Sequence, residues 1–268
     1  MSPRLAAHAP LHPLFAWDRH WREHATTNAR NPAQVYRREL IFRLLALRHA
    51  PAPVRLLDLG CGAGDLDMHL VLARRDIEIL GLDGSETGID IARCKVPGGQ
   101  FRQQDLTRPL VVPGFERWAT HAVCTEVLEH LDDPASMLRN ARPLLAPGCK
   151  LVITVPAGPM SVFDRHIGHR LHFTAALLRR TIEDAGLDVI DIRGAGFPFF
   201  NLYRLAVIAR GEKLVEDAAE GDESRLPLAV KAAIRTFGAL FKLSIDRTTL
   251  GWQLVAVVSP RSAAWSAT

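Results

Sequence analysis

The stretch L-L-D-L-G-C-G-A-G-D at residues 56–65 places three glycines at alternate positions, beginning two residues after an aspartate. A glycine inside regular structure costs about 0.5–1 kcal/mol relative to alanine, so this spacing indicates a backbone that a ligand must approach closely. The apolar run 54–59 that leads into it is typical of a buried strand. Because open α/β sheets bind ligands at the carboxyl ends of their strands, the stretch predicts a site for a dinucleotide or a smaller nucleoside cofactor.

Short apolar runs alternate with helical patterns along most of the chain. Such alternation predicts an α/β fold, a doubly wound and mainly parallel sheet of seven strands that is covered by helices on both faces. The predicted strands are 54–59, 77–83, 99–105, 119–125, 149–156, 187–194 and 251–259. The predicted helices are 34–49, 65–75, 86–94, 133–145 and 174–186, with Asp133 and Thr174 as N-caps and Gly186 beyond the last.

Two segments do not follow this alternation of strands and helices. We expect residues 1–53 to form an N-terminal helical cover, and residues 54–268 to form the ligand-binding domain with a helical insertion at 195–250. Within the insertion, 197–214 is apolar almost all round and predicts a buried helix, whereas 226–243 has one apolar face. The pair can pack on the sheet, or it can cover an apolar substrate or touch a membrane surface.

Composition narrows the class of protein. The net charge of +4 is spread along 268 residues without a dense basic run, which favours a solvated surface over a nucleic-acid footprint. Four cysteines without a C-x-x-C pair predict reduced thiols and a cytoplasmic location. We expect no signal peptide and no transmembrane segment, although an apolar insertion is compatible with peripheral membrane contact or a homodimer.

The glycine spacing distinguishes between the two cofactor classes. A dinucleotide site has G-x-G-x-x-G, whereas this chain has G-x-G-x-G with Asp58 in front of it. A carboxylate that points into the site suits a ligand with an ammonium and a sulfonium. The stretch resembles the first motif of class I S-adenosylmethionine-dependent methyltransferases. Further segments follow in the order of that family: I-L-G-L-D-G-S at 79–85, Q-Q-D-L at 103–106, C-T-E-V-L-E-H-L-D-D-P at 124–134 and L-L-A-P-G-C-K-L-V-I-T-V-P at 144–156.

The resemblance implies a Rossmann-like methyltransferase fold and S-adenosyl-L-methionine as the cofactor. It implies that Asp83 holds both ribose hydroxyls, which suits a carboxylate as a double acceptor, and that Asp105 and Leu106 meet the adenine. The full set of cofactor residues it implies is Asp58, Gly60, Cys61, Gly62, Gly64, Asp83, Gly84, Ser85, Asp105, Leu106 and Thr125.

Candidate catalytic residues follow the fourth and fifth predicted strands. T-E-V-L-E-H at 125–130 is similar to the E-x-x-E-H of the ubiquinone-pathway O-methyltransferases and of small-RNA 2′-O-methyltransferases. In those families such residues, with a later histidine, can bind a divalent metal. In related chains that bind no metal, the glutamate caps the backbone and the histidine orients the loop. The resemblance thus implies Glu126, Glu129, His130 and His169 as ligands for Mg²⁺ or Mn²⁺.

Three histidines at 166, 169 and 172 stand in the loop after the fifth predicted strand. The segment 164–174 resembles the D-x-x-x-G-H-x-x-x-aromatic-Ser/Thr pattern of bacterial relatives. Histidine titrates near neutrality, so we predict His169, with His130 and Glu126, as the catalytic residues. The alternative is that His169 only stiffens the loop.

These observations predict a methyltransferase that acts on a small molecule. O-methylation of an aromatic, isoprenoid-like or natural-product acceptor is the leading hypothesis. The alternatives are N- or C-methylation, metal-dependent RNA 2′-O-methylation, a cofactor-binding module without activity, and a nicotinamide-dependent oxidoreductase.

Overall fold

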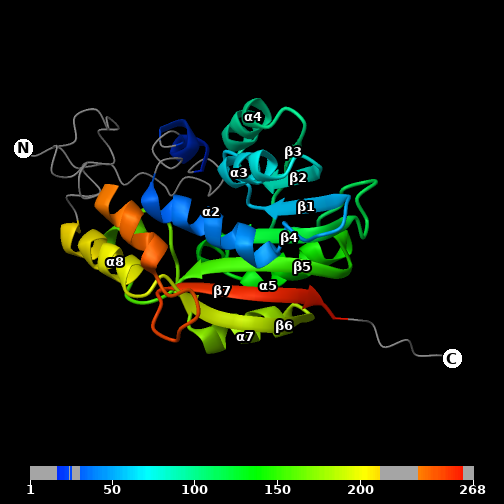
Figure 1. Cartoon of the computed structure of the whole chain (residues 1–268). Helices are drawn as coiled ribbons and strands as arrows, with labels where there is room; N and C mark the ends of the chain where they lie inside the picture. Colours follow the sequence, from blue (N-terminus) through cyan, green and yellow to red (C-terminus); the bar gives the residue numbers. More distant parts are fainter. Residues whose placement is uncertain (1–16, 24, 26–30, 212–234, 262–268) are drawn as a thin grey trace, which may run out of the picture.

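The computed structural model describes residues 17–23, 25, 31–211 and 235–261. Its centre is a seven-stranded sheet in the order β3-β2-β1-β4-β5-β7-β6 (Figure 1). The strands from β3 to β5 are parallel, and β7 runs antiparallel to both β5 and β6. The bounds are β1 Val54–Leu59, β2 Ile77–Asp83, β3 Gln100–Gln103, β4 Ala119–Thr125, β5 Leu145–Pro156, β6 Leu187–Ala195 and β7 Gln253–Pro260. The predicted mainly parallel α/β sheet is confirmed.

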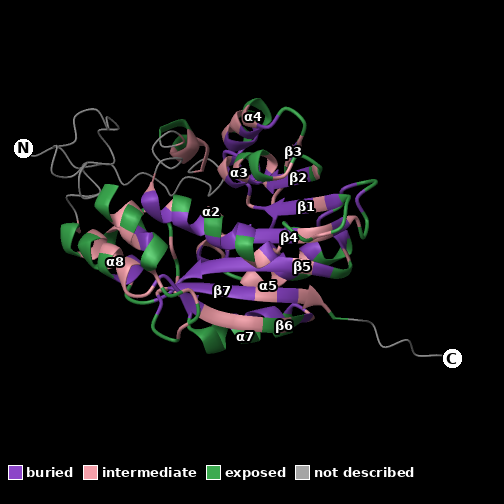
Figure 2. Ribbon diagram, viewed as in Figure 1, coloured by how far each residue is buried: buried purple, intermediate pink, exposed green. Residues whose placement is uncertain are grey.

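Helices cover both faces of the sheet, so the fold is doubly wound. One hydrophobic core joins the sheet to α2, α3 and α4, and the other joins it to α5 and α7. The central strands β1, β4, β5 and β7 are buried along most of their length, whereas the edge strands β3 and β6 are less buried (Figure 2). The helix bounds are α2 Pro32–Leu45, α3 Asp65–Ala73, α4 Glu86–Lys95, α5 Pro134–Ala141, α6 Val162–His166, α7 Ala175–Asp184 and α8 Phe199–Arg210. The 3₁₀ turns are η1 Leu128–His130, η2 Arg142–Leu144 and η4 Phe241–Leu243.

The helix termini follow the local chemistry of the sequence. The Asp133 carboxylate accepts a hydrogen bond from the Ser136 amide, and the Thr174 hydroxyl accepts one from the Leu177 amide. Both predicted N-caps are therefore confirmed. Gly186 follows α7 with a φ of 73°, a left-handed value that glycine adopts without steric cost.

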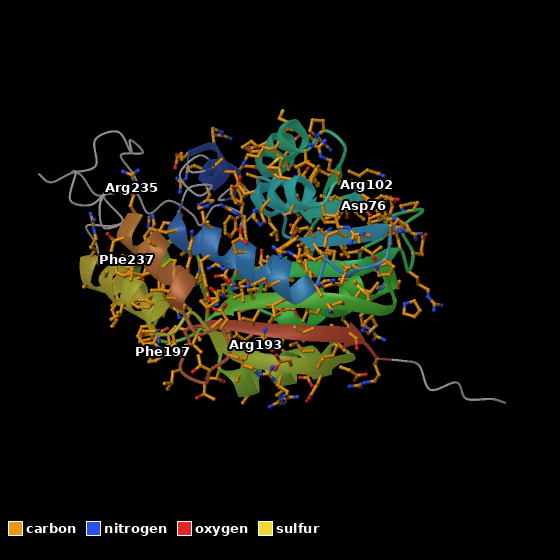
Figure 3. All side chains as sticks on the ribbon, in the orientation of Figure 1. Asp76, Arg102, Arg193, Phe197, Arg235 and Phe237 are labelled. Atoms are coloured by element: carbon orange, nitrogen blue, oxygen red, sulfur yellow. The ribbon has the colours of Figure 1, made fainter. Side chains whose placement is uncertain are left out.

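The prediction of a buried helix at 197–214 was wrong. In α8 only Phe200 and Asn201 are buried, and the side chains of Leu202 and Leu205 are each 48% exposed. The apolar side chains of the helix lie on two faces. The inner face lines the cavity described below, and no described residue covers the outer face. Of the second predicted helix, residues up to 234 lie outside the described residues. The rest forms a helix over 235–240, from which Phe237 reaches Tyr203 of α8 at 5.6 Å between ring centroids (Figure 3).

No helix in the described ranges combines the length and apolar character needed to cross a bilayer.

Candidate active site

A cavity of about 460 Å³ opens at the carboxyl ends of β1, β2, β4 and β5. Further wall residues come from the helix over 17–23, from α2, α3, α6 and α8, from the loop after α6, and from the beginning of β7. Seven of the eleven predicted cofactor residues lie in that wall: Asp58, Gly60, Cys61, Asp83, Gly84, Leu106 and Thr125. The others, Gly62, Gly64, Ser85 and Asp105, lie outside it.

The glycine loop is held against β2 by Asp83. Its carboxylate accepts hydrogen bonds from the Gly62 and Ser85 amides, each at 2.8 Å. Gly60, Gly62 and Gly64 have φ values of 83°, 51° and 71°, in the left-handed region that side chains rarely adopt. The three glycines are therefore required by backbone conformation, and Asp83 orders the loop in addition to its predicted contact with a ribose.

An N-terminal helix over 17–23 lies against this loop. The Trp21 ring lies only 2.2 Å from where a Cβ on Gly62 would be, so any side chain at Gly62 would collide with it. The Asp18 carboxylate accepts hydrogen bonds from the Ser85 hydroxyl and the Thr87 amide at the beginning of α4. The described helix over 17–23 is thus fixed to the same loop, which frames the cavity, and to the beginning of α4.

Asp105 is engaged outside the cavity. Its carboxylate accepts hydrogen bonds from the amide and hydroxyl of Thr107, and it forms an ion pair with Arg108 at 3.2 Å. The neighbouring Leu106 is buried and lines the cavity. The predicted contact between Asp105 and the adenine stays a prediction, since it would require this carboxylate to reach beyond its present partners.

Glu126 stands at the end of β4 with a φ of 55°, an uncommon conformation for a glutamate that marks functional sites more often than chance. One carboxylate oxygen lies 2.9 Å from an Arg37 guanidinium nitrogen, and the other accepts hydrogen bonds from Thr154 and Gln253. Arg37 in turn donates to the Gln253 amide oxygen. This network fixes the position of the Glu126 carboxylate at the cavity wall.

Glu129, His130 and His169 form a separate cluster, each with a potential ligand atom within 4.8 Å of the others. His130 and His169 line the cavity, and their rings meet edge to face at 4.7 Å. Glu129 is fully buried, and neither carboxylate oxygen accepts a hydrogen bond from the described residues. The structure therefore brings three of the four predicted metal ligands together, whereas Glu126 pairs with Arg37 instead.

A hydrogen-bond chain defines the tautomer of His169. The His172 Nδ1 atom meets the Gly158 carbonyl oxygen at 3.0 Å and must donate to it. The neutral ring of His172 then accepts at Nε2, so His169 donates from Nδ1 across 3.1 Å. His169 Nε2 then carries the lone pair, and a Glu129 oxygen lies 4.0 Å from this atom. Burial lowers the pKa of His169 to about 3, which keeps its ring neutral.

Asp164 and Arg204 connect the histidine loop to α8. Two guanidinium nitrogens of Arg204 donate to the two oxygens of Asp164, at 3.1 and 2.6 Å. The carboxylate also accepts hydrogen bonds from the amide and hydroxyl of Ser161. Hydrogen bonds from Arg204 and Ser161 outweigh the effect of burial and lower the pKa of Asp164 to about 2.

Replacement of Arg204 by methionine is expected to destabilise the fold by about 3–5 kcal/mol at pH 7, because Asp164 would remain buried without its cation. The lowered pKa of Asp164 means that the pair stabilises the fold above about pH 4 and that this contribution fades as the pH falls toward 2. Urea unfolding at pH 7 and pH 3 measures the difference, which should shrink in acid. Arg247→Met, at a side chain 76% exposed, is the control. An equal loss at both pH values would contradict this account.

Sequence reasoning missed Gln253 and Arg204. Gln253 is buried within an otherwise apolar last strand, and Arg204 interrupts an apolar helix. A polar residue inside an apolar run is the signal that could have identified each of them, since buried polar groups need partners. Which partners they meet depends on the position of β7 and α8 in the fold, and local sequence does not contain that information.

Comparisons with known proteins agree with the geometry. A methyltransferase domain family matches residues 31–192. The chain is 31% identical over 169 residues to a ubiquinone biosynthesis O-methyltransferase of Aeromonas salmonicida, covering 56% of this chain and 70% of that protein. It is 27% identical over 186 residues to the protein of the same name from Acinetobacter baylyi, covering 62% of this chain and 77% of the relative.

Solved structures share the fold at low identity. The geranyl diphosphate C-methyltransferase of Streptomyces coelicolor, in complex with Mg²⁺, geranyl diphosphate and S-adenosyl-L-homocysteine, matches with a TM-score of 0.53 and 14% identity over 84% of this chain and 77% of that one. The [4+2]-cyclase SpnF matches with a TM-score of 0.54 and 18% identity over 84% of this chain and 81% of the other. From the family match, the relatives and the sheet topology, we conclude that the chain belongs to the class I S-adenosylmethionine-dependent methyltransferases.

Proposed function

We propose that this enzyme transfers the methyl group of S-adenosylmethionine to an oxygen of a small aromatic, isoprenoid-like or natural-product acceptor. The observation that carries the proposal is the composition of one cavity. Its wall contains seven of the eleven predicted cofactor residues, the His130–His169 pair, and apolar and aromatic side chains of α8. The relatives named as O-methyltransferases support oxygen over nitrogen or carbon as the acceptor atom.

The part of the cavity that would bind the cofactor is shaped by the glycine loop, which Asp83 holds in place. A carboxylate has about four lone-pair positions, and the Gly62 and Ser85 amides occupy two of them. Two positions are left for the vicinal hydroxyls of a ribose. Asp58, buried in the same wall, supplies negative character for the ammonium and sulfonium of the cofactor.

The acceptor half is shaped by α8 and the loop after β5. Phe200, Tyr203 and Val207 of α8 line the cavity together with Phe163 and Ile167. Such a wall suits a flat or branched apolar acceptor, which would gain about 25 cal/mol per Å² of apolar surface removed from water. The described wall contains three arginines: Glu126 binds Arg37, Asp164 binds Arg204, and the charge of Asp65 acts on Arg38. The acceptor that fits this wall is therefore mostly apolar.

His169 is the proposed base. Its neutral ring carries a lone pair on Nε2, because the hydrogen bond to His172 uses Nδ1 as the donor. As the acceptor oxygen bonds to the methyl carbon and the carbon–sulfur bond breaks, the hydroxyl proton passes to Nε2. The residues around the cavity contribute mainly by holding the oxygen in line with the methyl group.

A divalent metal bound by Glu129, His130 and His169 is a second way in which the same site could activate the acceptor hydroxyl. The two unpartnered oxygens of the buried Glu129 fit this role, because a buried carboxylate needs a cation or a hydrogen-bond donor. One carboxylate and two imidazoles suit Mn²⁺ better than Mg²⁺, which prefers oxygen ligands. When bound, the metal would polarise an acceptor hydroxyl and ease its deprotonation.

Removal of metal tests this mode. If the cluster holds a cation, dialysis against EDTA should abolish methyl transfer, and added Mn²⁺ should restore it. Glu129→Gln should then lose the response to metal while S-adenosylhomocysteine still binds. Activity that is indifferent to EDTA would leave His169 acting alone as the base.

Methyl transfer from labelled S-adenosylmethionine into a cell extract, followed by fractionation, tests the proposed function. Label in the organic-soluble fraction is the expected result, and mass spectrometry of that fraction identifies the acceptor. Label in RNA or protein would overturn the small-molecule proposal. Peripheral membrane contact, a homodimer and a cytoplasmic location stay predictions.

A further inference from the structure

Two buried carboxyl groups lie next to each other beneath the glycine loop, and only one of them belongs to the motif that predicted the site. Asp58 near the end of β1 is 1% exposed and lines the cavity. Asp67, in the first turn of α3, is fully buried and is not part of the cavity wall. The two side chains are close enough to share a hydrogen bond.

The pair has no compensating cation among the described residues. The charged groups that act on Asp58 are Asp67 and Asp83, and Asp65 acts on Asp67. Asp65 itself is paired with Lys95. Neither oxygen of Asp67 accepts a hydrogen bond from a described donor, and the same holds for one oxygen of Asp58.

The other titratable groups facing the pair are thiols. Cys61 follows β1 and Cys124 lies on β4, and burial raises the pKa of both well above the ordinary value. Both thiols are therefore neutral and add no charge to the pair.

Two carboxylates in this position cannot both be ionised without cost, because like charges in a buried site repel each other. A proton held between them supplies the missing donor and removes one of the two charges. Burial and the neighbouring carboxylates raise the pKa of Asp58 well above its ordinary value, and burial raises that of Asp67 to about 7. The two groups titrate as a unit, so the proton belongs to the pair.

We propose that Asp67 is a positioning residue through which the site senses ligand charge: with Asp58 it holds a proton that leaves for solvent when the cationic S-adenosylmethionine binds. The inference rests on the proposed cofactor site. S-adenosylmethionine and S-adenosylhomocysteine share the ammonium and the carboxylate, and differ by the methyl group and the positive charge on sulfur. A difference in proton release between the two therefore reports the change at sulfur, which is the methyl group and its positive charge.

The consequence is a selectivity for substrate over product that depends on pH. Deprotonation of the pair adds a negative charge beside the site, which strengthens binding of the sulfonium more than binding of the neutral thioether. The affinity for S-adenosylmethionine should rise with pH, by up to about tenfold per pH unit for one linked proton. The affinity for S-adenosylhomocysteine should rise less.

Calorimetry of the whole protein in two buffers of different ionisation enthalpy measures the protons released. We expect more release on binding S-adenosylmethionine than on binding S-adenosylhomocysteine at pH 7. In Asp67→Asn the side-chain amide donates to Asp58 and keeps it ionised, so both ligands should still bind while the difference in proton release disappears. Asp90→Asn makes the same substitution at a carboxylate 65% exposed on α4 and should leave the difference intact.

The wild-type measurement decides the inference even if the variant fails to fold. Equal release for the two ligands, or none, would overturn the role of the pair and leave the cofactor site standing. A difference that persists in Asp67→Asn would also overturn it. Failure of both ligands to bind the wild-type protein would overturn the cofactor site and this inference together.

Discussion

Replacement of Asp83 by alanine is expected to weaken S-adenosylhomocysteine binding by about 1.5–3 kcal/mol, roughly a 10- to 150-fold rise in Kd. The carboxylate contributes twice in the proposed complex. It would accept hydrogen bonds from the ribose hydroxyls, and it already holds the Gly62 and Ser85 amides that shape the loop. Alanine removes both contributions.

Calorimetric titration with S-adenosylhomocysteine measures the loss without knowledge of the methyl acceptor. Asp76→Ala is the matched control, because that carboxylate is 49% exposed and pairs with Arg74 away from the cavity. A thermal melt of both variants separates loss of the binding contact from loss of folded protein. Unchanged affinity in Asp83→Ala would show that the cofactor does not lie along β2.

Replacement of His169 by asparagine is expected to lower kcat by about 10²- to 10⁴-fold, the contribution of a positioned general base. Asparagine can still donate toward His172, so the loop keeps a partner at that position. The variant lacks the Nε2 lone pair that would receive the acceptor proton. Binding of S-adenosylhomocysteine should be nearly unchanged, since the predicted cofactor contacts are made by other residues.

Single-turnover methyl transfer with the acceptor identified from the extract measures this effect. His166→Asn, at an exposed histidine of the same loop that does not line the cavity, is the control and should keep wild-type activity. Retained activity in His169→Asn would assign the ring to stiffening the loop. The metal experiment then distinguishes a base from a ligand, because only a ligand makes the wild-type rate depend on added cation.

Much of the fold could be predicted from local sequence. The alternation of apolar runs with capped helices identified the seven strands, and the helix signals at Asp133 and Thr174 were correct because capping depends on neighbouring residues. The glycine spacing identified the loop at the end of β1 for the same reason. These features are decided within a few residues of chain.

The features that could not be predicted depend on contacts between segments that are distant in sequence. The prediction that α8 is buried was wrong because an apolar helix that lines a cavity on one side has the same composition as a helix that is buried on all sides. The partners of Glu126 were not predictable, since Arg37 comes from α2 and Gln253 from β7, far apart in sequence. The pattern E-x-x-E-H predicts one joint site, whereas the fold gives its two glutamates different neighbours.

The position of β7 has a consequence for the order in which the protein can be made. This strand lies between β5 and β6, yet it is the last of the seven to be synthesised. A nascent chain on the ribosome can therefore assemble β1 to β5, but β6 has no neighbour in the sheet until residues 253–260 emerge from the exit tunnel. The same residues bring Gln253 to Glu126, so this part of the cavity wall is completed only when β7 joins the sheet.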